Sequence, residues 1–239
     1  MPTDDQGLHD LLYAGLFRDI GDADHHYELV RAIGRRSEEV NQSGFGSFFG
    51  MIQGTLQSAY VLAVSRIYDP PPRQYPTRSI RAVVHYLAQN AKGLRIQAPG
   101  AIVDRIRKLS PVTQMPDPLE PERFTRQVAC VIGDALLARQ ASVDKVRMLR
   151  DKRIAHNEAV DTAKLVKPTW NEAHELLALA RDVAVIVGHG YLTTICEDGT
   201  GAWILDSGPR GRAYELNKVI DFVVEGHQRE VDILRGPVD

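Results

Sequence analysis

The chain has 239 residues, of which 44% are apolar and 25% are charged, and this composition is ordinary for a folded cytosolic protein. Its 29 Lys and Arg residues are balanced by 31 Asp and Glu residues, which excludes a general attraction to nucleic acid or anionic membranes and leaves anion binding to local clusters. The two cysteines, Cys130 and Cys196, lie in separate apolar runs. Without a disulfide framework or a signal-peptide pattern, we expect a cytoplasmic protein.

Apolar residues recur with helical spacing along most of the chain. In chain order, they predict helices over about 8–20, 24–40, 41–69, 76–87, 102–109, 121–136, 142–149, 169–187 and 213–224. β-prone residues over 191–196 and 203–205 predict a small hairpin near the C-terminus, too little strand for a sheet-based fold. We therefore predict an all-α fold, a bundle of about six to eight helices.

Helix ends are marked by proline and by capping residues. Pro70, the first of three consecutive prolines, ends the helix over 41–69, and residues 110–121 form a proline-rich loop. Ser142 is predicted to cap one helix. Thr169 and Glu172 have the spacing of a capping box at the start of another.

The segment 41–65 contains no charged residue and is long enough to span a bilayer. Its several Asn, Gln and Ser side chains give it poor hydropathy for a span, so we predict no membrane helix. Gly46, Gly50 and Gly54 share one helix face, which lets another helix approach closely. The pattern favours a central helix buried within the domain.

Motifs of several large enzyme classes are absent from the sequence. It has no triphosphate-binding G-x-x-x-x-G-K-[ST], no dinucleotide-binding G-x-G-x-x-G, no G-x-S-x-G elbow and no H-E-x-x-H helix. The informative segment lies elsewhere, over 145–157. Five of the nine residues from Lys145 to Arg153 are basic and only Asp151 is acidic, so this is a strong local positive cluster in a nearly neutral protein.

The cluster is followed by His156, whose side-chain type titrates near neutral pH and suits proton transfer. Arg150 and Arg153 can hold a phosphate through two hydrogen bonds each. A base beside phosphate-binding cations is the minimum needed for RNA cleavage without a metal. The base removes the 2′-OH proton, and arginine stabilises the charge that develops on the phosphate oxygens.

The stretch Arg150–His156 resembles the motif of the HEPN superfamily, in which arginine is followed by a polar residue, four to six further residues and histidine. HEPN proteins are all-helical and often act as metal-independent ribonucleases in toxin–antitoxin and antiphage systems. The longer string Leu149–His156 is similar to the abortive-infection branch of this superfamily. So is Ser65–Asp69, which stands directly before the three prolines that begin at Pro70. The resemblance covers about residues 45–190.

This resemblance implies roles for individual residues. His156 would be the general base or a ligand of the 2′-OH, Arg150 would bind and polarise the scissile phosphate, and Asp151 would orient one of the two. It also implies a homodimer that acts on RNA, needs no metal or cofactor and is paired with an antitoxin or defence partner protein. Further contacts to the RNA are assigned to Lys152, Arg153, Asn157 and Arg147.

Helix geometry leaves alternatives open. Residues six apart on a regular helix differ by about 120° around the axis, so Arg150 and His156 do not share a face unless the helix ends or bends, or a second chain supplies one of them. The basic cluster is otherwise a solvated helix end that His156 caps. In that case Asp151 pairs with Lys145 or Arg147, and Arg66 and Asp69 form a local ion pair.

We predict a single helical domain over 1–239, with a HEPN-like core over about 45–190, an N-terminal helical extension over 1–40, and the hairpin and last helix over 191–239. The resemblance favours an endoribonuclease of an abortive-infection or toxin system. Two alternatives are a non-catalytic HEPN-like module that binds RNA, nucleotide or protein, and a helical adaptor whose basic helix binds an acidic partner.

Overall fold

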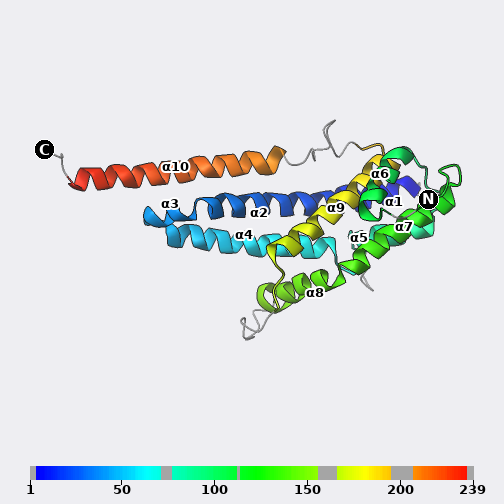
Figure 1. Cartoon of the computed structure of the whole chain (residues 1–239), viewed down its shortest axis with the longest axis horizontal. Coiled ribbons are helices and arrows are strands. Elements are labelled where there is room, and N and C mark those ends of the chain that lie inside the picture. The colour runs from blue at the N-terminus through cyan, green and yellow to red at the C-terminus, as the bar shows by residue number, and fades with distance from the viewer. Residues whose placement is uncertain (1–3, 71–76, 112–113, 156–165, 195–206, 236–239) are drawn as a thin grey trace. The chain divides into compact units, whose positions relative to one another are not determined.

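A computed structural model describes residues 4–70, 77–111, 114–155, 166–194 and 207–235 (Figure 1). Every regular element in these residues is helical, which confirms the all-α prediction. The helices are α1 Asp4–Leu11, α2 Phe17–Arg35, α3 Ser37–Gln42, α4 Gly46–Ile67, α5 Ile80–Asn90, α6 Pro99–Leu109, α7 Pro121–Ala138, α8 Gln140–Leu149, α9 Trp170–Tyr191 and α10 Ser207–Arg235, with π-helical turns η1 Leu12–Leu16 and η2 Arg150–Ala155. The predicted hairpin falls mainly on residues 195–206, outside the described part, and its first residue, Tyr191, ends α9.

The chain divides into two compact units. The first comprises residues within 1–20 and 61–204 and contains the segment with the HEPN-like motif. In it, α5 packs on α7, α6 packs on α7 and α9, and α8 packs on α9. Every residue over 183–188 of α9 is buried, so α9 is the central helix of this unit.

This finding corrects the prediction that the neutral segment 41–65 is a buried central helix. Phe48 and Met51 of α4 are exposed, and no described atom outside the helix lies within 4 Å of a Cβ added at Gly50 or Gly54. The small, uncharged side chains of this stretch therefore contribute little burial over the first half of α4. None of the described helices combines the length and hydropathy needed to cross a membrane.

The second unit comprises residues within 21–60 and 205–239. A small apolar core joins its helices, with Ile33, Val40, Phe49 and Ile220 buried at its centre. Arg36, between α2 and α3, forms ion pairs with Asp221 of α10 and with Glu39. Apolar burial and these partly exposed ion pairs together hold α10 against α3 within this unit.

Candidate functional site

The site begins at the C-terminal end of α4, where the chain makes a tight turn. The amide of Tyr68 donates to the carbonyl of Ser65 (3.1 Å) and the amide of Asp69 donates to that of Arg66 (3.2 Å). Pro70 follows and prevents the helix from continuing. The buried Tyr68 ring fixes this turn to the core, because its hydroxyl donates to the carbonyl of Leu176 in α9 (2.5 Å).

Arg150 lies where α8 gives way to the π-helical turn η2. A π-helical turn winds more loosely than an α-helix and is frequently found at functional sites. The 120° separation expected between Arg150 and His156 assumed a regular α-helix. That assumption does not hold here, since the winding changes at Arg150 itself. His156 and Asn157 lie outside the described residues, as does the side chain of Arg153.

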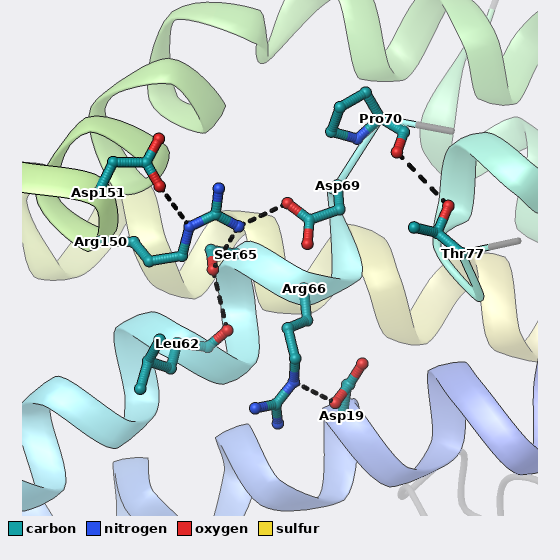
Figure 2. Close-up of polar contacts among 9 residues, drawn as sticks. All are labelled: Asp19, Leu62, Ser65, Arg66, Asp69, Pro70, Thr77, Arg150 and Asp151. Atoms are coloured by element: carbon teal, nitrogen blue, oxygen red, sulfur yellow. Dashed lines mark hydrogen bonds and ion pairs between the residues drawn. The ribbon is translucent and has the colours of Figure 1, made fainter. Parts of the chain in front are cut away.

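The Arg150 guanidinium is held by three side chains (Figure 2). Its Nη1 donates to Asp69 Oδ1 (2.6 Å) and, at a longer 3.4 Å, to Ser65 Oγ. Its Nε donates to Asp151 Oδ1 (2.7 Å). Ser65 is itself fixed by donating to the Leu62 carbonyl (3.0 Å). Two elements separated by 81 positions in the sequence are thereby joined at one arginine.

Two carboxylates face this one guanidinium. Burial acts to lower the pKa of Arg150, but the hydrogen bonds that it donates to Asp151 and Asp69 outweigh burial and raise the pKa above its ordinary value. Arg150 therefore stays protonated at any pH at which the protein is folded. The side chains of Arg150 and Asp69 are only 19% and 25% exposed, so this pair is shielded from solvent more than a surface ion pair.

The local ion pairs that the sequence suggested are not formed. Asp69 accepts from Arg150 rather than from Arg66, and Arg66 donates to Asp19 of α2 (2.8 Å). Asp151 likewise accepts from Arg150 rather than from Lys145 or Arg147. The pairs suggested by helical spacing therefore do not form. Side-chain direction at a helix end depends on tertiary packing, which sequence spacing does not reveal.

The basic cluster is less positive than its sequence indicates. Lys145 pairs with Glu172 (2.5 Å), the N3 residue of the predicted capping box that opens α9. Arg150 faces two acids, and the Nε of Arg147 is buried without a hydrogen-bond partner among the described residues. The positive charges of Lys145 and Arg150 are therefore partly neutralised within the unit.

Replacing Glu172 by glutamine is expected to remove a pH-dependent part of the stability. The hydrogen bond from Lys145, followed by that from the Thr169 amide, lowers the pKa of Glu172 from 4.5 to about 2. Because the folded-state pKa lies below the unfolded one, the charged carboxylate stabilises the fold fully above about pH 4.5, and this contribution disappears as the pH falls through about 2. Denaturant unfolding should give Glu172→Gln a lower free energy of unfolding than wild type at neutral pH. In acid the two free energies should become equal. A separation that is the same at both pH values would contradict this role.

Comparison with protein families identifies the relationship. A family model, HEPN_AbiU2, described as AbiU2, matches residues 5–194, which include both Ser65–Asp69 and the basic cluster. The chain belongs to this HEPN-type abortive-infection family. The resemblance inferred from the motif is thus confirmed, and the AbiU2 match extends to α1–α3, which the motif had left outside. No curated protein and no solved structure matches the chain.

Proposed function

We propose that this AbiU2 member is a metal-independent endoribonuclease that acts in the cytoplasm as part of an antiphage, abortive-infection system. The observation that carries the proposal is the arrangement of Arg150. A permanently charged guanidinium at the family motif is half-buried and fixed by Asp69 and Asp151, with Nη2 unpaired among the described residues. Such preorganised donors stabilise charge that develops in a transition state.

In the proposed reaction, the 2′-oxygen of a ribose attacks the adjacent phosphorus. His156 removes the 2′-OH proton as the new O–P bond forms. The bond from phosphorus to the 5′-oxygen breaks, and this oxygen takes up a proton from water as it leaves, while the proton held by His156 returns to the resulting hydroxide. The products are a 2′,3′-cyclic phosphate and a 5′-hydroxyl. Arg150 stabilises the negative charge on the non-bridging oxygens, and Asp151 holds the Nε side of the guanidinium.

The remaining residues of the segment are proposed to bind the RNA backbone. All four lie within seven positions of Arg150 in the sequence: Lys152, Arg153, Asn157 and Arg147. We further propose a homodimer, because two copies of the segment brought together would place the histidine of one copy near the arginine of the other. An antitoxin or another defence protein would restrain such an activity in the uninfected cell.

The test is cleavage of RNA by the purified protein in EDTA, with DNA of the same sequence as the control. We expect cleavage of RNA alone, with 2′,3′-cyclic phosphate ends. Cleavage that EDTA abolishes, or cleavage of the DNA, would contradict the proposal. RNA binding without cleavage would instead favour the non-catalytic module, which the occupied state of the Arg150 guanidinium also suits.

A further inference from the structure

We propose that Asp69 is a positioning residue that orients Arg150 toward the phosphate of a bound RNA. This role depends on the proposed function, and it adds a residue outside the Arg150–His156 segment to the site. Asp69 reaches no reacting atom in this account. It acts through the Arg150 guanidinium, to which its Oδ1 is hydrogen-bonded at 2.6 Å.

The first support is that two of the three guanidinium nitrogens of Arg150 are hydrogen-bonded within the unit. Nε is engaged by Asp151, and Nη1 is engaged by Asp69 and Ser65. The third nitrogen, Nη2, has no partner among the described residues and carries no contact in Figure 2. A planar guanidinium held on two of its nitrogens can rotate no further, so its remaining N–H groups point in one fixed direction.

The second support is the rigidity of Asp69 itself. Its amide is bonded to the Arg66 carbonyl, and the preceding residue, Tyr68, is anchored to α9 through a buried hydroxyl. The carboxylate also lies just beyond the C-terminal end of α4, where the helix dipole adds partial negative charge and favours a cation. The backbone of Asp69 is thus held by contacts that do not involve Arg150, as a supporting residue must be if it is to fix a catalytic group.

The third support is how weakly the Arg150 side chain would be held if Asp69 were absent. Without Asp69, the long Arg150 side chain would be held through Nε by its neighbour Asp151, which is 48% exposed, and by the longer 3.4 Å bond from Nη1 to Ser65. An exposed partner next in sequence restrains a side chain weakly, because both residues can turn together. A misplacement of about 1 Å in a group that stabilises a transition state costs on the order of a hundredfold in rate.

The chain offers a matched control. Arg105 of α6 and Asp182 of α9 form an ion pair of the same kind at 2.8 Å, with side chains 13% and 22% exposed, close to the 19% and 25% of Arg150 and Asp69. Asp182 has no part in the proposed site. Asp182→Asn should therefore lower stability about as much as Asp69→Asn and leave cleavage unchanged, which separates a structural effect from a positioning one.

The experiment compares wild type, Asp69→Asn, Asp69→Ala and Asp182→Asn for cleavage kinetics and thermal unfolding. We expect Asp69→Ala to lower kcat by about 10- to 100-fold with a smaller change in KM. Asp69→Asn should lose less, because its amide oxygen can still accept from Nη1. Equal losses in Asp69→Ala and Asp182→Asn, or full activity in Asp69→Ala, would overturn the proposal. Faster cleavage by Asp69→Asn would overturn it too, since Asp69 would then compete with the phosphate.

A second readout does not require cleavage. The Nε–H resonance of Arg150, assigned through Arg150→Lys in arginine-labelled protein, is followed during titration with 2′-O-methyl RNA, which cannot be cut. The resonance should shift in wild type and Asp182→Asn, and should be displaced and unresponsive in Asp69→Ala. If wild type cleaves no RNA, the proposed function fails, yet this shift pattern still supports the positioning of Arg150. An Arg150 resonance that ignores RNA in wild type would overturn it.

Discussion

Alanine at His156 or at Arg150 is expected to lower the rate of RNA cleavage by at least about a hundredfold. Removing a general base typically costs about 10²- to 10⁴-fold, and removing one preorganised donor costs about 10²- to 10³-fold. Arg150→Lys should recover little of the loss, because lysine keeps the charge but lacks the planar fork that Asp69 and Asp151 hold. The measurement is kcat on a defined RNA in EDTA, with folding checked by circular dichroism.

Two substitutions serve as matched controls for these variants. His85 is an exposed histidine of α5, and Arg123 of α7 has a side chain that is 74% exposed and pairs with the nearby Glu120. His85→Ala and Arg123→Ala should cut RNA like wild type. The assignment of roles would be wrong if His156→Ala retained full activity, or if His85→Ala lost as much.

Tyr68→Ala is expected to destabilise the protein by about 3–5 kcal/mol, as truncation of a large buried aromatic residue does. The Tyr68 side chain is 1% exposed and links the end of α4 to α9. Tyr68→Phe keeps the ring and loses the hydroxyl bond to Leu176, which should cost about 1 kcal/mol. Denaturant unfolding measures both values.

Leu119, which is 88% exposed, provides the control for the tyrosine variants. Leu119→Ala should change the free energy of unfolding by less than about 0.5 kcal/mol. If Tyr68→Ala were as mild as Leu119→Ala, Tyr68 would not be the anchor of the turn that carries Asp69. If Tyr68→Phe lowered the free energy of unfolding as much as Tyr68→Ala does, the hydroxyl, and not ring packing, would hold this turn.

Local signals predicted most of the helices and some of their ends. The capping box of Thr169 and Glu172 is formed as predicted, and α7 begins at Pro121. The prediction that Ser142 caps α8 is wrong, because a tight turn at Arg139 lets α8 begin at Gln140. Helix starts of this kind depend on how the preceding helix ends, which a single capping residue does not reveal.

The start of α5 and the interior of α2 differ from prediction for similar reasons. The helix predicted from residue 76 begins at Ile80 instead. Ser79 caps it, and the Ser79 hydroxyl accepts from the Ala82 amide. Separate helices were predicted over 8–20 and 24–40, but α2 runs through the gap between them and includes Gly21. One glycine costs a helix about 1 kcal/mol, which packing on either side can offset. Propensity alone therefore misplaces such boundaries.

The candidate site could be predicted only in part. Arg150 and Asp151 were found through a motif, and Ser65–Asp69 was recognised as part of the same resemblance. The bond between Arg150 and Asp69 was not predicted, because no spacing rule relates residues 81 positions apart. The change to a π-helical turn at Arg150 also has no sequence signature. The Arg150–Asp69 bond depends on tertiary structure that brings Asp69, just beyond α4, next to the start of η2 within one unit.

The most direct test of the central claim is a single 2′-deoxy substitution in the RNA at the mapped cleavage position, assayed in EDTA. The proposed chemistry has the 2′-oxygen as the nucleophile. Removal of that one oxygen should abolish cleavage at this bond while leaving other cut sites and RNA binding unchanged. Continued cleavage at the substituted position would contradict the account, because the phosphate would then be attacked by another group and His156 could not have the role given to it here.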